Sequence, residues 1–258
     1  MTIKNVRTQS PLVLTYANFV TPQFVANVVN VIGASPLMSR EVSEFNDLCQ
    51  IADAVVINIG TLKANELSDI VTLSKVATNL DKPVILDPVA VAVPFRSKAV
   101  QTLMQEGHVD IIRGNAAEIA WFADIDFDSQ GIDATGSGDV IAIAQLAAEK
   151  TGAIIALSGA KDVISDGHQT AVIETDVPLL STNVGTGDAL SSVIGAFVAE
   201  SLTVENVTYA MATFKLAGLK ASRQITTPGF YSMQLLDELA AITSEEVATF
   251  MIESVQYL

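Results

Sequence analysis

The segment Val184–Leu190 (VGTGDAL) joins a glycine-rich turn to an acidic residue, Asp188. Apolar residues follow at the spacing of a helix with one buried face, namely Leu190, Val193, Ile194, Phe197 and Val198. Asp188 is therefore expected at a helix N-terminus, where unpaired N–H groups and the helix dipole favour an anion. Two roles fit this position. Asp188 caps the helix, or it is a general base that deprotonates a hydroxyl while the amides hold a phosphoryl group.

The composition limits the classes of protein to which the chain can belong. Its 258 residues suit one α/β domain over 1–258, and half of them are hydrophobic. No apolar run approaches the roughly 20 residues that a membrane span needs. The N-terminus has no long apolar core of a signal peptide, and Cys49 is the only cysteine, so we expect a cytoplasmic protein. A formal charge of −15 argues against nucleic acid as a partner, because phosphate contacts need Lys and Arg.

Short apolar runs alternate with helical patterns through the first two thirds of the chain. The predicted strands are 54–59, 83–86, 109–112 and 153–157, and the predicted helices are about 63–80, 95–105, 115–122 and 138–151. This alternation predicts a mostly parallel sheet covered by helices on both faces. An antiparallel hairpin and edge are expected at 163–165, 169–174 and 178–180. The chain after Asp188 is expected to be almost wholly helical, with a capping box of Thr243 and Glu246.

Polar residues follow each predicted parallel strand. Ligands bind at the carboxyl ends of such strands, so these residues are expected to converge on one edge of the sheet. They are Asn58 and Gly60, Asp87, Arg113 with Asn115 and Glu118, and Ser158 with Gly159.

Taken together, these segments resemble the hydroxyethylthiazole kinase family of the ribokinase-like superfamily. The resemblance runs from about residue 10 to the final helices, and the segments occur in the order of the family. They are GASPLM (33–38), VINIGTL (56–62), PVILDPV (83–89) with PFR (94–96), IIRGNAAEI (111–119), ALSGAKDVISDG (156–167) and VGTGD (184–188). The resemblance implies a three-layer α/β/α fold and transfer of phosphate from MgATP to 4-methyl-5-(2-hydroxyethyl)thiazole in thiamine biosynthesis and salvage. It also implies a homotrimer with active sites at subunit interfaces.

The resemblance assigns the catalytic and nucleotide-binding roles. Asp188 matches the catalytic position, where many thiazole kinases carry cysteine and the wider superfamily carries aspartate. Gly185, Thr186 and Gly187 are expected to form the anion hole. Arg113, Ser158 and Asn115 are expected to contact ATP, with Ser158 at a position that is usually threonine.

The metal and acceptor sites also follow from the resemblance. Glu118 and Asp87 are expected to organise Mg²⁺ through water, because Mg²⁺ sheds water reluctantly. Met38, Asn18, Gly60 and Gly185 are expected to contact the acceptor, and a thioether can pack against a sulfur heteroaromatic ring.

Two segments depart from the family pattern on the acceptor side. Residues 14–23 (LTYANFVTPQ) keep Asn18 but lose most of the polar side chains, and 89–93 (VAVAV) replaces a glycine-rich run. An acceptor such as a pyrimidine alcohol therefore stays an alternative, as does a paralogue that binds nucleotide without turnover. The segment 133–139 (DATGSGD) also resembles a sugar-kinase signature, but it precedes the strand 153–157. It is therefore interpreted as a loop that ends in a helix N-cap.

Overall fold

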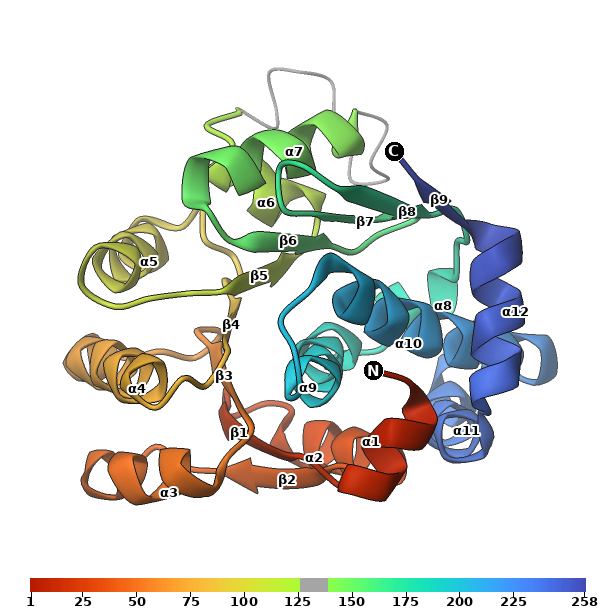
Figure 1. Ribbon diagram of the computed structural model, residues 1–258, viewed down its shortest axis with the longest axis horizontal. Helices are drawn as coiled ribbons and strands as arrows, with labels where there is room; N and C mark the ends of the chain where they lie inside the picture. The colour runs from red at the N-terminus through yellow and green to blue at the C-terminus, as the bar shows by residue number, and fades with distance from the viewer. Residues whose placement is uncertain (126–138) are drawn as a thin grey trace.

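The computed structural model describes residues 1–125 and 139–258, and these residues form a nine-stranded sheet (Figure 1). The strand order is β2-β1-β3-β4-β5-β6-β7-β8-β9. The strands from β2 to β6 are mutually parallel, and β7, β8 and β9 continue the sheet in antiparallel pairs. The strands are β1 (Leu12–Tyr16), β2 (Ser35–Met38), β3 (Ala54–Asn58), β4 (Val84–Asp87), β5 (Ile111–Gly114), β6 (Ile154–Leu157), β7 (Asp162–Ser165), β8 (Thr170–Ile173) and β9 (Val255–Tyr257).

Helices cover both faces of the sheet and make the expected three-layer α/β/α architecture (Figure 1). One face carries α1 (Ile3–Gln9), α2 (Pro22–Val31), α8 (Pro178–Ser181), α9 (Thr186–Val198), α10 (Val204–Gln224), α11 (Pro228–Ala241) and α12 (Ser244–Ser254). The other face carries α3 (Phe45–Ile51), α4 (Leu67–Asn79), α5 (Pro94–Glu106), α6 (Ala116–Phe122) and α7 (Val140–Thr151), with single 3-10 turns at Val42–Glu44 and Ala64–Glu66.

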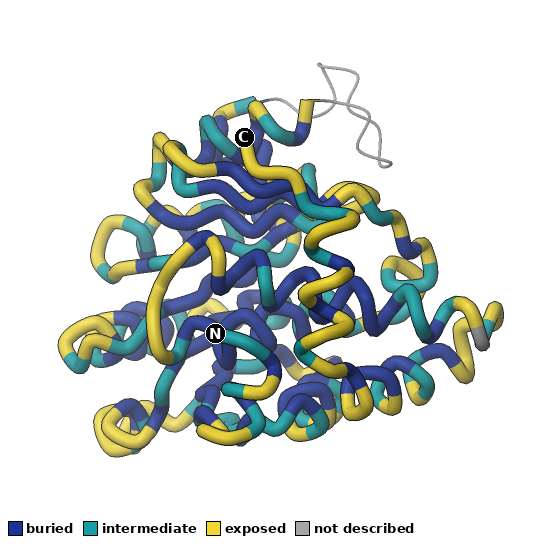
Figure 2. The backbone as a smooth tube through the Cα atoms, turned by 45° about the vertical axis from the view of Figure 1, so that its right-hand side comes forward, coloured by how far each residue is buried: buried dark blue, intermediate teal, exposed yellow. Residues whose placement is uncertain are grey.

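The two hydrophobic cores explain why the central strands are apolar throughout. Val56 packs into the core with α9, whereas its neighbours Val55 and Ile57 pack into the core with α4. Successive side chains of a strand point to opposite faces, so burial on both faces requires an uninterrupted apolar run. Strands β1 and β3 to β8 are buried almost throughout, whereas β2 is half-buried and β9 is mostly exposed. Exposure otherwise gathers on the outer helices and turns (Figure 2).

The predicted strands and helices are confirmed with small shifts at their ends, as are the hairpin of β7 and β8 and the capping box of Thr243 and Glu246. One prediction is wrong: residues 178–180 begin the helix α8, because Pro178 suits the first helical position, where no N–H is needed. The chain after Asp188 is almost wholly helical, as predicted, and the exception is Val255–Tyr257, which returns as β9 and pairs with β8.

The parallel register brings the carboxyl ends of six strands to one edge. Thr15 pairs with Met38, Asn58 pairs with Asp87, and Gly114 pairs with Leu157. The expected convergence of polar residues is therefore confirmed. Among the helices of the described residues, none is long and apolar enough to cross a membrane.

Candidate active site

Asp188 lies in the first turn of α9 and does not cap it. The N-cap residue is Gly185, and no side chain caps the helix. The capping role for Asp188 is therefore wrong. Its carboxylate instead faces the edge of the sheet, which leaves the first-turn amides of α9 without a side-chain partner.

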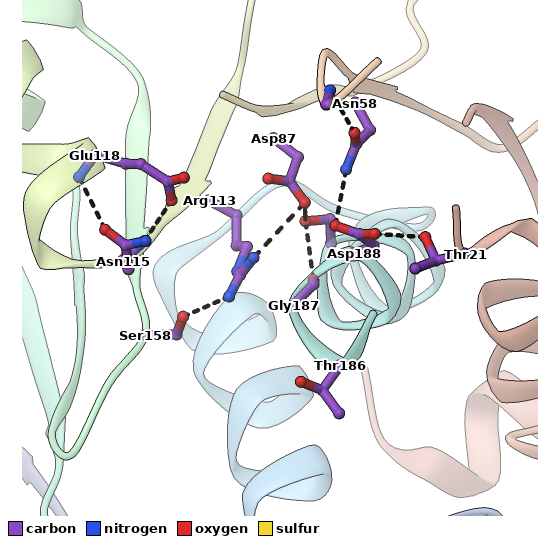
Figure 3. Close-up of polar contacts among 12 residues, drawn as sticks. Thr21, Asn58, Asp87, Arg113, Asn115, Glu118, Ser158, Thr186, Gly187 and Asp188 are labelled. Atoms are coloured by element: carbon purple, nitrogen blue, oxygen red, sulfur yellow. Dashed lines mark hydrogen bonds and ion pairs between the residues drawn. The ribbon is translucent and has the colours of Figure 1, made fainter. Parts of the chain in front are cut away.

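Three side-chain donors from two other segments hold the Asp188 carboxylate, and Figure 3 labels two of them, Thr21 and Asn58. The amide of Asn18 and the hydroxyl of Thr21 donate to its Oδ2 at 2.8 and 2.5 Å, and the amide of Asn58 donates to its Oδ1 at 3.0 Å. All three donors are buried, and Asn18 also donates to Asn58 Oδ1. The carboxylate is thus fixed against the ends of β1 and β3.

The turn before Asp188 requires glycine at two positions. Gly185 has φ +97°, and a Cβ there would lie 2.8 Å from the methyl group of Thr21. At Gly187 a Cβ would lie 2.5 Å from a guanidinium nitrogen of Arg113. The hydroxyl of Thr186 has the carbonyl oxygens of Leu180 and Asn183 within reach as acceptors, at 2.7 and 3.0 Å, and its backbone amide donates to the Asn183 carbonyl at a longer 3.4 Å.

Arg113 lies in β5, one residue before its end, and its guanidinium group lies over Gly187. Its Nη2 donates to Ser158 Oγ at 2.6 Å, and its Nη1 lies 3.6 Å from Asp87 Oδ2 (Figure 3). Its Nε is buried without a hydrogen-bond partner. The guanidinium group is therefore held at the start of α9 with hydrogen-bonding capacity to spare.

Asp87 ends β4 and is fully buried. Its Oδ2 accepts a hydrogen bond from Ser191 at 2.8 Å, while its Oδ1 has no partner. Burial is the main cause that raises the pKa of Asp87 to about 7; the charge of Arg113 and the Ser191 hydrogen bond act against this rise, and the carboxylates of Asp188 and Glu118 add to it. The residue is thus a buried carboxyl group with one oxygen that has no hydrogen-bond partner.

Asn115 and Glu118 form a capping box at the start of α6. Asn115 Oδ1 accepts from the Glu118 amide at 3.0 Å, and Glu118 Oε2 accepts from the Asn115 amide at 2.9 Å. Glu118 Oε1 accepts from the amide of Ala90, which has φ +54° and lies where the family has its glycine-rich run. An alanine in this left-handed region is strained. The Glu118 carboxylate therefore ties α6 to the loop after β4.

A cavity of about 590 Å³ opens beside Arg113. Its polar lining includes Arg113, Asn115, Ser158 and the α9 turn at Thr186 and Gly187. Its apolar lining includes Val140, Leu157, Val177, Pro178, Leu180, Leu190, Met211 and Phe214. A cavity of this size, with apolar walls and a few polar groups, suits a ligand that has an anionic part and a flat apolar part.

A buried ion pair forms part of this cavity wall. Lys215 Nζ lies 2.9 Å from Asp162 Oδ1 and donates to the carbonyl oxygen of Gly159, also at 2.9 Å. Burial raises the pKa of Asp162, and the Lys215 ammonium group lowers it. The pair fixes the turn from Ser158 to Asp162, which holds the hydroxyl partner of Arg113.

The predicted acceptor residues lie farther along the same edge. Asn18 contacts Asp188 directly, and the Gly60 amide donates to Asn58 Oδ1 at 2.9 Å. Arg96 joins the neighbouring loops by donating to the carbonyl oxygens of Gly60 and Val89. Met38 ends β2, half-buried against the core, and is not among the residues that line the 590 Å³ cavity.

Most of the segment 133–139 lies outside the described residues. Its last residue, Asp139, caps α7 by accepting from the amide of Ala142 at 3.1 Å. The predicted N-cap is confirmed.

Comparison with known proteins decides the family. The model of the hydroxyethylthiazole kinase family matches residues 3–245. A curated relative, hydroxyethylthiazole kinase 1 of Leuconostoc mesenteroides, is 66% identical over 99% of this chain and 98% of its own length. The chain belongs to the hydroxyethylthiazole kinase family.

Solved structures agree with this assignment. A hydroxyethylthiazole kinase protein from Pyrococcus horikoshii superposes with a TM-score of 0.87 and 32% identity, over 99% of this chain and 96% of that one. A ribokinase-like superfamily protein from Enterococcus faecalis gives a TM-score of 0.62 at 16% identity, over 93% and 89% of the two chains, which supports the fold alone. This hydroxyethylthiazole kinase family member is thus a phosphotransferase with a ribokinase-like fold.

Two residues of the site are missed by sequence reasoning. Thr21 precedes Pro22 at the start of an apolar helical pattern, a position typical of a helix cap. Lys215 stands alone in the apolar run MATFKLAG, and a lone cation within such a run is the available signal for a buried pair.

The buried Asp87 predicts a pH-dependent stability. The folded protein binds a proton at Asp87 up to a pH of about 7, whereas the unfolded chain releases it near 3.8. As the pH rises from 5 to 8, the titration of Asp87 therefore lowers the free energy of unfolding by roughly 2–3 kcal/mol. Asp87→Asn removes that contribution, so its stability relative to the parent protein should rise with pH over this range.

Urea unfolding of both proteins at pH 5 and pH 8, in buffer with EDTA, measures this difference. Asp237→Asn, on an exposed face of α11, is the matched control and should show no such change. An equal stability difference between Asp87→Asn and the parent protein at both pH values would contradict the raised pKa.

Proposed function

We propose that this family member transfers the γ-phosphoryl group of ATP to the hydroxyl of 4-methyl-5-(2-hydroxyethyl)thiazole, in thiamine biosynthesis and salvage. The observation that carries the proposal is one arrangement: the clamped carboxylate of Asp188 follows a glycine turn whose Thr186 and Gly187 line a large cavity together with Arg113. The name of the Leuconostoc mesenteroides relative, 66% identical, supports the choice of acceptor.

In the proposed reaction, Asp188 is the general base. The alcohol proton passes to its carboxylate as the alcohol oxygen forms a bond to the γ-phosphorus, and ADP departs with the electron pair of the broken P–O bond. The first-turn amides of α9, at Gly185, Thr186 and Gly187, stabilise the charge of the phosphoryl group together with the dipole of the helix.

The nucleotide occupies the 590 Å³ cavity in this proposal. Arg113 supplies a cation to the phosphates, and Ser158 fixes its guanidinium group. Asn115 also lines the cavity, and the apolar lining residues receive the base. A local cation matters here, because the whole chain carries a charge of −15.

In this proposal, the carboxylates of Asp87 and Glu118 hold Mg²⁺ through water molecules, next to the phosphates of ATP. No group of three potential ligands that could hold a metal directly is found among residues 1–125 and 139–258. Asp87 offers an oxygen that has no hydrogen-bond partner, and Glu118 accepts a hydrogen bond from Ala90, in the loop that follows Asp87. Mg²⁺ commonly keeps several waters beside one or two carboxylates and substrate phosphates. When bound, it would neutralise charge on the transferred group.

The acceptor is proposed to lie beside Asn18, Gly60, Gly185 and Met38. A location between the ends of β2 and β3 places its hydroxyl next to Asp188. Phe19 and Val20 follow Asn18 and are exposed, which gives this side an apolar surface.

The expected homotrimer of single-domain subunits, in the cytoplasm, stays a prediction. Exposed Phe19, Val20 and Val184 beside the acceptor side are compatible with a subunit contact there. Light scattering measures the assembly directly: a particle of three chain masses supports the trimer, and a stable monomer contradicts it.

Replacing Asp188 with Asn tests the proposed base. The amide keeps the size of the side chain but cannot take the proton, so kcat with ATP and the thiazole alcohol should fall by about 10²–10⁴-fold. The amide also leaves one of the three donors without an acceptor, which should lower stability by about 1–3 kcal/mol. Product formation and thermal unfolding are measured on the same preparation.

Asp47→Asn is the matched control, because Asp47 is likewise an acid in the first turn of a helix, α3, and lies far from the site on the other layer. The Asp47→Asn variant should keep the kcat of the parent protein. Near-normal turnover of Asp188→Asn, once folded, would remove Asp188 from the mechanism.

Chelation tests the metal. With EDTA in excess over Mg²⁺, turnover should cease and should return when Mg²⁺ is restored. Unchanged turnover in EDTA would refute the assignment of Asp87 and Glu118.

A further inference from the structure

Thr21 is the one donor to Asp188 that the family resemblance does not point to. It occupies the N-cap position of α2, where threonine usually accepts a hydrogen bond from a backbone amide of the first turn. No such bond forms, and the backbone angles of Thr21 are not those of an ordinary cap. The side chain is nevertheless buried, with 7% of the residue exposed. The local structure of α2 therefore does not explain this threonine.

The hydroxyl hydrogen of Thr21 has two acceptors within reach. Asp188 Oδ2 lies at 2.5 Å and Asn18 Oδ1 at 3.2 Å. Asn18 Oδ1 already accepts from the amides of Val20 and Thr21 at 2.8 and 3.1 Å. The shorter distance and the charge of the carboxylate favour donation to Asp188.

The methyl group of Thr21 lies beside Gly185. A Cβ added to Gly185 would lie 2.8 Å from it, closer than two non-bonded carbon atoms can approach. Thr21 therefore bonds the proposed base through its hydroxyl and packs beside the glycine turn through its methyl group.

The donors limit how Asp188 can receive a proton. An ionised carboxylate has about four lone-pair positions. Asn18 and Thr21 occupy both positions of Oδ2, and Asn58 occupies one of Oδ1. One position on Oδ1 remains for a substrate hydroxyl.

We infer that Thr21 is a positioning residue of the phosphoryl transfer, whose hydroxyl fixes the Asp188 carboxylate so that only Oδ1 receives the alcohol proton. The inference rests on the proposed function, in which Asp188 is the base. Without this hydroxyl, Oδ2 gains a free lone pair and the carboxylate can rotate away from the acceptor.

Two substitutions separate the hydroxyl from the methyl group. Thr21→Val keeps the shape and the contact with Gly185 but removes the donor, and kcat should fall by about 10- to 100-fold. KM for ATP should change little, because the nucleotide cavity does not include Thr21. Thr21→Ser keeps the donor and loses only the methyl group, so most of kcat should return.

A double-mutant cycle gives a second readout. In an Asp188→Asn background, Thr21→Val should cause little further loss of kcat, because the hydroxyl acts only through the carboxylate. A full additional loss in that background would overturn the inference. If thermal unfolding shows that Thr21→Val does not fold, the kcat of Thr21→Ala is compared with that of Thr21→Ser, because these two variants differ only in the hydroxyl.

The outcomes distinguish the inference from the function on which it rests. If Asp188→Asn is inactive and Thr21→Val keeps the kcat of the parent protein, the role of Thr21 is overturned and Asp188 remains the base. Equal losses in Thr21→Val and Thr21→Ser also overturn it, because they assign the effect to packing. Near-normal turnover of Asp188→Asn removes the base on which the inference rests, whereas a parent protein that does not phosphorylate the thiazole alcohol overturns the proposed function itself.

Discussion

The site depends on one constraint, the clamp that three buried donors place on the carboxylate of Asp188. The donors Asn18, Thr21 and Asn58 come from the ends of β1 and β3 and from the start of α2, and Asp188 comes from α9. A charged group held by donors on rigid elements cannot move without leaving those donors unpaired, which is costly for buried groups. The clamp thus fixes α9 against the sheet edge as well as the direction of its acid.

The remaining contacts follow from this placement. With α9 fixed, its glycine turn lies under Arg113, and the absence of a side chain at Gly187 allows the guanidinium group to approach the helix start. Arg113 is in turn positioned by Ser158, whose turn is held by the buried pair of Lys215 and Asp162. A chain with a strong net negative charge thereby concentrates positive charge where phosphates are proposed to bind.

Much of the fold is predictable from the sequence, because strands buried on both faces leave uninterrupted apolar runs, and β3 to β6 have them. The short N-terminal elements β1, β2, α1 and α3 lack a period long enough to identify them. The edge strand β9 depends on pairing with β8, a contact between distant parts of the chain. In the site, Asp188 and Arg113 carry motif signals, whereas Thr21 resembles an ordinary helix cap. Its role emerges only when folding brings Asp188 to it from 167 residues along the chain.

The most direct test of the account is a structure of the complex with a non-hydrolysable ATP analogue and the thiazole alcohol. The account predicts the alcohol oxygen within roughly 2.6–3.2 Å of Asp188 Oδ1. It also predicts the γ-phosphoryl group at the first turn of α9 beside Arg113, and an Oδ2 that still accepts from Asn18 and Thr21. An alcohol oxygen bound elsewhere, with Asp188 contacting only its three donors, would contradict the account.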